Sequence, residues 1–210
     1  MKKLFLASFA IIAFSLLSQA QFKLGIVAGG DLSKQRINIS EGNGLFSNDK
    51  YKSYHAGLVS EIQITEHIYI QPQVLYTRKC ATLLHSTGEA DTKIRINYIN
   101  LPVNVLYKLS VPFGKVFGGA GPSFSYGFGG KQQQGAQKSG IYGNHSNWKH
   151  EDVGLSFTAG VEFNNGLFAS INSQKGLLDV YKADGASIKN RSVAVSIGYL
   201  IDWNSFKRNR

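Results

Sequence analysis

Two groups of residues in this chain could take part in catalysis or binding, and the first contains histidines, a serine and a carboxylate. Its members are His85, Ser86, His145, His150 and Asp152. A serine that is activated by a histidine and an acid can transfer acyl groups, such as the acyl chains of lipid A. The histidine must then lie within hydrogen-bond reach of the serine, and nothing in the spacing indicates such contact. We therefore expect no catalytic residue and no enzyme activity. The alternative is a lipid-modifying enzyme with a His/Ser site at the rim of a membrane barrel.

The same group contains the best candidates for a metal site, His145 and His150. No third ligand follows at a diagnostic spacing, so we expect no metal. The glycine-rich run over residues 118–130 is similar to a phosphate-binding loop only in composition, because Lys131 is followed by Gln132 and not by serine or threonine. Small residues that fill a narrow barrel explain the run better, and we expect no cofactor.

The second group consists of charged residues that share the polar face of predicted strands: Lys23, Glu61, Lys108, Glu162 and Asp202. Each lies within a few residues of the strand end that we assign to the periplasm. A lone charge in a filled interior is costly, whereas opposite charges can satisfy one another. We therefore expect a paired network that closes the periplasmic end as a structural plug; a periplasmic docking surface is the alternative. Which lysine meets which carboxylate does not follow from the sequence.

The strand that carries Glu162 has the clearest pattern in the chain. From Asp152 to Phe163, apolar residues alternate with polar and small residues, which is typical of a strand with two different faces. Glycine, serine and threonine on one face suit a narrow interior, and aromatic residues on the other face suit lipid. The sequence Asn164-Asn165-Gly166 then predicts a tight hairpin turn into the next strand.

Similar alternation continues along the chain. The predicted strands cover residues 22–30, 54–65, 68–79, 93–108, 115–128, 152–163, 167–177 and 191–203. Long connections, predicted over residues 31–50, 81–92, 129–151 and 178–189, alternate with short turns. Outer-membrane barrels have this arrangement, with the short turns in the periplasm. The sequence predicts an all-β fold: an eight-stranded antiparallel up-and-down transmembrane β-barrel in the outer membrane, with both termini periplasmic.

Two features predict irregularities in this barrel. The apolar phase of the fourth strand slips, which indicates a β-bulge near Tyr98. Pro72, Pro102 and Pro122 lie within predicted strands, where proline cannot donate a ladder hydrogen bond. We expect each proline to mark a bulge or a local break.

The ends of the chain predict export. Residues 1–20 combine Lys2 and Lys3 with a short apolar run and the small residues Ser18 and Ala20, which is typical of a signal peptide. We expect residues 21–204 to form the barrel and residues 205–210 to form a short basic periplasmic tail. No later apolar run approaches the length of a membrane helix, so insertion must use strands.

The net charge of +10 favours anionic partners. Because the chain is predicted to be exported, we expect outer-membrane lipid and lipopolysaccharide phosphate as partners, and no nucleic acid. Basic residues at the predicted outer rim form a collar that suits such phosphates: Arg78, Lys79, Arg95, Lys93, Lys131, Lys138 and Lys149. Ordinary solubility is the alternative explanation for this collar.

Several short motifs follow one another along the chain in a characteristic order. They are Gly25 to Gly30, Tyr54-His55-Ala56-Gly57, Gln71-Pro72-Gln73-Val74-Leu75-Tyr76, Tyr98-Ile99-Asn100-Leu101-Pro102, Gly121-Pro122, Gly160-Val161-Glu162-Phe163 and Gly198-Tyr199. In this order and spacing, the chain resembles the PorT-like outer-membrane barrels of Bacteroidetes. It departs from them at Cys80, at Asn100 and in the tail after Trp203. The resemblance implies an outer-membrane location and, for the namesake branch, a role in protein secretion.

We therefore expect a non-enzymatic barrel that presents extracellular loops for binding or supports an envelope or secretion assembly, with an envelope protein as a further partner. A pore is disfavoured, because side chains fill the lumen of an eight-stranded barrel. A secreted lipocalin-type barrel is the soluble alternative. It would place the apolar face inward, whereas the opposite face carries glycine, serine, glutamine and glutamate.

Overall fold

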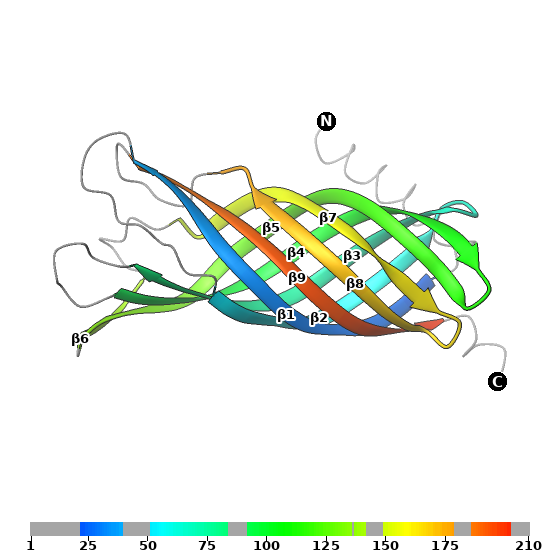
Figure 1. Cartoon of the computed structure of the whole chain (residues 1–210), viewed down its shortest axis with the longest axis horizontal. Coiled ribbons are helices and arrows are strands. Elements are labelled where there is room, and N and C mark those ends of the chain that lie inside the picture. Colours follow the sequence, from blue (N-terminus) through cyan, green and yellow to red (C-terminus); the bar gives the residue numbers. More distant parts are fainter. Residues whose placement is uncertain are drawn as a thin grey trace, which may run out of the picture.

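Nine strands make up the described part of the chain, and eight of them form the wall of a closed barrel in this computed structural model (Figure 1). The structure describes residues 22–39, 51–83, 92–135, 137–141, 149–178 and 186–202. The wall strands are β1 (Phe22–Ile39), β2 (Tyr51–Gln63), β3 (Ile68–Leu83), β4 (Thr92–Val111), β5 (Gly114–Gln134), β7 (Glu151–Phe163), β8 (Leu167–Gly176) and β9 (Ala186–Asp202). The remaining strand, β6 (Gln137–Gly140), forms a hairpin with β5.

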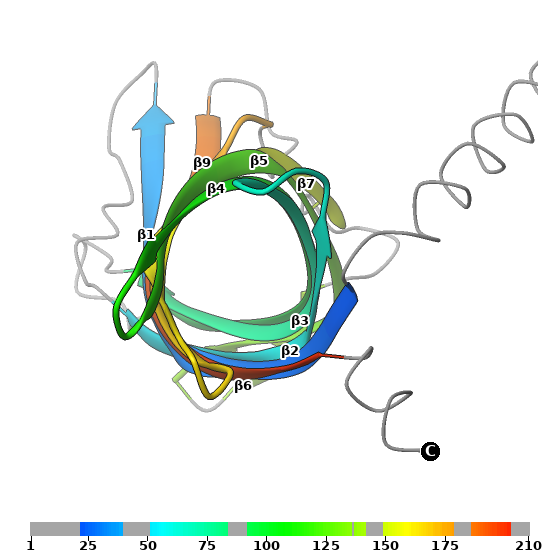
Figure 2. The same ribbon diagram turned by 90° about the vertical axis from the view of Figure 1, so that its right-hand side faces the viewer.

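The wall strands follow one another around the barrel in chain order, and every pair is antiparallel. The ladder between β1 and β9 closes the ring, from Lys23 opposite Asp202 to Ile39 opposite Ala186. Figure 2 looks along the barrel and shows this ring. The predicted all-β, eight-stranded up-and-down barrel is therefore confirmed.

The two ends of the barrel differ. Short turns at residues 64–67, 112–113 and 164–166 lie at one end, together with the start of β1 and the end of β9. We call this the turn end and the opposite one, where the β5–β6 hairpin projects, the loop end (Figure 1). The predicted Asn164-Asn165-Gly166 hairpin is present. Gly166 has a φ of 89°, which glycine adopts without the steric cost of a Cβ atom.

Apolar side chains face outward along the wall, and polar side chains face inward. In β7, Phe157 is 49% exposed on the outside, whereas Ser156 and Thr158 are buried inside. The same alternation places Ile26, Leu58 and Val105 on the outer surface of other strands. An apolar exterior around a polar interior is the pattern of a barrel that lies in lipid, and it is the reverse of a lipocalin. The predicted faces of these strands are correct.

Several strands extend farther toward the loop end than the sequence predicts. β1 continues to Ile39 instead of ending at Gly30, because its backbone stays paired with β9 as far as Ala186. β5 continues to Gln134, and β6 lies within the predicted loop over residues 129–151. Apolar residues no longer alternate regularly in these extensions, as with Leu32, Ile37 and Ile39 of β1, so the period-two signal stops before the hydrogen-bond ladder does. One consequence is that Asp31 belongs to a strand and not to a loop.

The three prolines break the ladders without shifting the register. Beside Pro72, the β2–β3 pairing passes from Val59↔Gln73 directly to Ile62↔Ile70. Equivalent gaps occur beside Pro102 in the β3–β4 ladder and beside Pro122 in the β4–β5 ladder. The prediction of local breaks is confirmed, and the cause is the missing N–H donor of proline.

The predicted irregularity near Tyr98 is also present, but the extra residue lies on the partner strand. Asn97 pairs with Gly129 and Tyr98 with Gly127, which leaves Phe128 of β5 without an opposite residue. The alternation of β4 itself continues, since Ile96 and Tyr98 are both buried. The inward and outward phase of β4 therefore does not change. The apolar pattern shifts because apolar residues of β4 face the lumen near the loop end.

The signal peptide predicted over residues 1–20 and the tail over 205–210 lie outside the described residues. Within the described ranges, there is no helix long and apolar enough to cross a membrane.

Candidate functional site

The lumen near the turn end contains a network of ion pairs from β1, β2, β4 and β7. Lys108 Nζ lies 2.5 Å from Glu61 Oε2 and 2.5 Å from Glu162 Oε2. Lys23 Nζ lies 2.5 Å from the other carboxylate oxygen of Glu162. The structure thus brings together four of the five charged residues that the sequence singled out, and it shows which lysine meets which carboxylate.

Asp202 lies beside this network. It is opposite Lys23 in the β1–β9 ladder, and both residues line a cavity of ≈ 330 Å³ at the mouth of the turn end. The ion pairs described above join Lys23, Glu61, Lys108 and Glu162. Asp202 therefore belongs to the rim of the network and not to its buried centre.

Aromatic and amide side chains support the buried lysine. Lys108 Nζ lies 4.8 Å from the ring centre of Tyr69 and 5.3 Å from that of Phe117. Gln71 Nε2 donates a hydrogen bond of 3.4 Å to Glu61 Oε2. Lys108 is only 2% exposed and Glu61 only 1%. At this depth each charge depends on its partners, because an unpaired buried ion carries a large desolvation penalty.

A layer of apolar side chains covers the network on the side of the loop end. Inward-facing residues of seven strands form one buried cluster: Val27, Val59, Tyr69, Leu75, Leu106, Phe117, Phe168 and Leu200. Along β2, Val59 lies between Glu61 and His55, and along β4, Leu106 lies between Lys108 and Asn104. The charge network and the apolar layer therefore occupy successive levels of the lumen.

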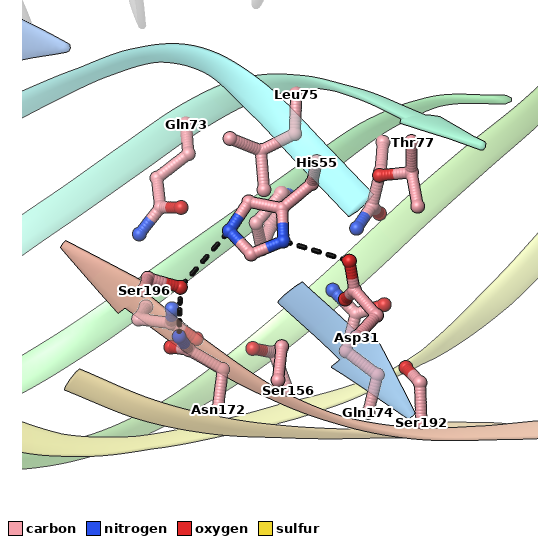
Figure 3. Close-up of a pocket in the computed structure, with 14 residues that line it drawn as sticks. Asp31, His55, Gln73, Leu75, Thr77, Ser156, Asn172, Gln174, Ser192 and Ser196 are labelled. Atoms are coloured by element: carbon pink, nitrogen blue, oxygen red, sulfur yellow. Dashed lines mark hydrogen bonds and ion pairs between the residues drawn. The ribbon is translucent and has the colours of Figure 1, made fainter. Parts of the chain in front are cut away.

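Above the apolar layer, a polar cavity contains a carboxylate, an imidazole and a hydroxyl in a row (Figure 3). Asp31 Oδ2 of β1 lies 2.8 Å from His55 Nδ1 of β2. His55 Nε2 lies 2.9 Å from Ser196 Oγ of β9. Asn172 Nδ2 of β8 donates a further hydrogen bond of 2.9 Å to the same Ser196 oxygen. Four consecutive wall strands are therefore joined by one hydrogen-bonded chain.

This row has the geometry of an acyl-transfer triad, in which a carboxylate orients a histidine that activates a serine. The sequence did not predict this row, because Asp31 falls in the predicted loop over residues 31–50 and no spacing along the chain links it to His55 and Ser196. Asp31 does continue the inward phase of Gly25, Val27 and Gly29, and that phase was the available signal.

The surroundings of the row differ from those of a hydrolase. The adjoining cavity has a volume of ≈ 20 Å³, enough for about one water molecule. Ser196 is paired with Gly29 on one side and with Ser170 on the other, so the backbone N–H groups around it serve the ladders and not an oxyanion. The main role of the row is therefore to connect neighbouring strands through buried hydrogen bonds.

The predicted rim residues do not form a site in the described part of the chain. His85, Ser86 and His145 lie outside the described residues. His150 is exposed at the loop end, where its ring stacks on Tyr126 with 5.4 Å between centres. Asp152 is buried in the lumen. Among the described residues, no cluster of histidine, cysteine and carboxylate side chains has the form of a metal site.

Outward-facing aromatic side chains near the loop end form a second notable surface. Ring centres are 6.3 Å apart between Tyr54 and Tyr76 and 6.2 Å apart between Tyr76 and Phe128. Tyr76 donates a hydrogen bond of 3.1 Å to Asn97 Oδ1. Of the predicted basic collar, Arg95 and Lys131 are exposed beside these rings, whereas the side chains of Lys79, Lys93 and Lys138 lie outside the described part. Such a band of aromatic residues is typical of the boundary between lipid tails and headgroups.

Comparisons with known proteins agree with this architecture. A family model described as an outer membrane protein beta-barrel domain matches residues 14–182. OprG from Pseudomonas aeruginosa has a TM-score of 0.56 at 12% identity, over 87% of this chain and 96% of that chain. Ail of Yersinia pestis has a TM-score of 0.47 at 14% identity, over 86% of this chain and 99% of that chain. No curated protein matches the chain.

Proposed function

Since the chain belongs to the family of outer-membrane β-barrel domain proteins, we propose that it is a non-conducting and non-enzymatic member. It acts through its extracellular loops, by binding or by supporting an envelope or secretion assembly. In this proposal the turn end faces the periplasm and the loop end faces the outside, as the short turns and long connections favour. Both termini of the barrel are then periplasmic.

The observation that carries this proposal is the closed lumen. The ion pairs around Lys108 and the apolar layer around Leu106 fill successive levels of the barrel. A filled lumen supports anchoring and loop presentation better than transport, because along β2 and β4 the buried Val59 and Leu106 lie between the charge network and the polar cavity. The function then depends on what projects from the barrel.

The β5–β6 hairpin is the best-defined projecting element, since Ile141 is buried against Gly130 at its base. The test replaces residues 132–148 by a short Asn-Gly turn and compares cross-linked partners on intact cells with those of the parent. We expect the hairpin variant to lose an envelope partner while its barrel still folds, as judged by its heat-dependent migration on gels. Asn165→Ser at the opposite turn is the matched control, and it should retain the partner. Identical cross-linked partners for parent and hairpin variant would contradict the proposal.

The finer assignment to the PorT-like branch of Bacteroidetes is also a proposal. It is supported by the ordered motifs and by the positions of Pro72, Pro102 and Pro122, each of which coincides with a break in the ladder on one side. The branch implies a role in protein secretion. Deletion of the gene, followed by a quantitative comparison of secreted proteins with and without the restored chain, tests that role directly.

A second candidate function is acyl hydrolysis, and the contact of His55 with Ser196 favours it. The small cavity argues against it, because an acyl substrate needs more room than one water molecule occupies. A fluorophosphonate probe reacts covalently with activated serines and separates the two functions. We expect no labelling of the folded parent. Labelling that disappears in Ser196→Ala and in His55→Ala would establish the enzyme instead.

A further inference from the structure

The outward-facing side chains nearest the loop end include two pairs of basic residues in direct cross-strand register. Arg95 of β4 is opposite Lys131 of β5, and Lys175 of β8 is opposite Arg191 of β9. All four residues are exposed. Like charges that lie directly opposite each other destabilise a sheet, unless an anion lies between them. The repetition at two places around the barrel indicates an anionic environment at this level.

The pair formed by Arg95 and Lys131 lies next to the aromatic band. Tyr76, Asn97 and Phe128 occupy outward positions closer to the middle of the barrel, and Tyr76 is in ring contact with Phe128. Beyond them, toward the middle, Leu101 and Phe124 are exposed apolar neighbours on the same strands. Along this surface the order is therefore apolar, aromatic and basic, from the middle of the barrel to the loop end.

This order matches the layers of a phosphorylated glycolipid in the outer leaflet. The acyl chains contact apolar side chains, the aromatic rings lie at the boundary, and the phosphate lies just above it. An arginine fork and a lysine ammonium together suit a phosphate, because arginine binds two oxygens at once and lysine adds a compact charge. Within the described part of the chain, no carboxylate lies within ion-pair distance of Arg95 or Lys131.

We propose that Arg95 and Lys131 form a binding site for a phosphate group of a lipid A-type glycolipid, whose acyl chains lie along the neighbouring outward face of β4 and β5. This inference rests on the proposed orientation, with the loop end outside. Lys175 and Arg191 form the equivalent contact farther around the barrel, where β7 separates the two pairs of strands. Arg78 of β3, which is opposite Asn97, borders the first site.

The test measures lipid binding by the full mature barrel in detergent, by native mass spectrometry. The probes are diphosphorylated lipid A, the same lipid without phosphates, and inorganic phosphate alone. We expect the parent to prefer the diphosphorylated lipid. The double variant Arg95→Gln/Lys131→Gln should bind this lipid at least about tenfold more weakly than the parent, because two charge-assisted contacts are lost. Both side chains are exposed, so the variant should fold, and its heat-dependent gel migration verifies this.

A matched control has the same change of net charge: Lys207→Gln/Arg208→Gln, in the tail after β9. It should bind diphosphorylated lipid A like the parent. Equal affinity of the parent for the two lipids, or equal affinity of parent and rim variant for the phosphorylated lipid, would overturn the proposal. If inorganic phosphate binds the parent and the parent shows no preference between the two lipids, the site binds free phosphate. That result would overturn the lipid assignment as well. Partner cross-linking is unaffected by these outcomes, so the proposed function is tested separately.

Discussion

Lys108 and Glu162 are 54 residues apart in the chain, yet their Nζ and Oε2 atoms meet at 2.5 Å inside the barrel. Glu61 binds the same ammonium from the opposite wall. Lys108 therefore contacts two carboxylates from different strands, and it shares one of them, Glu162, with Lys23. The order of strands around the ring makes this contact possible, because β4 and β7 are separated only by β5.

The first prediction concerns this shared lysine. Lys108→Ala leaves Glu61 and Glu162 buried with too little positive charge, and we expect it to lower the free energy of unfolding by about 3–5 kcal/mol. Adding Glu61→Gln to that variant should recover part of the loss, because Lys108 is the ion-pair partner of Glu61, whereas Glu162 keeps Lys23. Urea unfolding in lipid vesicles measures both effects in a double-mutant cycle. Additive effects of the two substitutions would show that the pair is not coupled.

The second prediction concerns the lipid-facing surface. Phe157 lies midway along β7 and points outward, so Phe157→Arg should cost about 2–4 kcal/mol of unfolding free energy at the bilayer midplane. Phe128→Arg, near the loop end, is the matched control and should cost about 0–1 kcal/mol. Equal costs at the two positions, measured in the same vesicles, would mean that the membrane is misplaced along the barrel.

The third prediction concerns the polar row in the lumen. Ser196→Ala removes the partner of both His55 Nε2 and Asn172 Nδ2, and we expect a loss of about 1–3 kcal/mol because buried polar atoms lose hydrogen bonds. Ser173→Ala, on the exposed face of β8, is the control and should change stability by no more than about 0.5 kcal/mol. A neutral Ser196→Ala would show that the row does not tie β9 to β2 and β8.

The fourth prediction concerns orientation. In a background with Cys80→Ser, a membrane-impermeant maleimide should label Ser139→Cys of β6 in intact cells. It should label Asn165→Cys, in the turn between β7 and β8, only after the envelope is disrupted. Both side chains are exposed, so access to the reagent and not burial decides the result. The reverse pattern would place the loop end in the periplasm and would remove the basis of the lipid A site.

Much of the fold follows from the sequence, because period-two alternation reports directly which residues face lipid. Phe157 and Glu162 were assigned to their correct faces in this way, and Pro72 to a local break. Strand ends were harder to predict. Beyond Gly30 the apolar alternation of β1 becomes irregular, and the ladder with β9 shows that Asp31 continues the inward phase of the strand.

The contents of the site were predictable in part. Charges on the polar face near the turn end had to meet, because a narrow lumen brings inward residues of the same level together. Their pairing was not predictable, since Lys23 is directly opposite Glu61 in the β1–β2 ladder and yet its ammonium meets Glu162 of β7. The row of Asp31, His55 and Ser196 depends on the same three-dimensional offset across β2, β1 and β9, which no spacing along the chain encodes.

The measurement that tests the closed lumen most directly is single-channel recording of the mature barrel in a planar lipid bilayer. Insertion is verified by recovery of folded protein from the membrane, and a large porin in the same bilayer is the positive control. We predict no discrete conductance steps from the parent, because the network around Lys108 and the apolar layer around Leu106 block the path of ions. Reproducible steps from folded parent protein would contradict a plugged, non-conducting barrel.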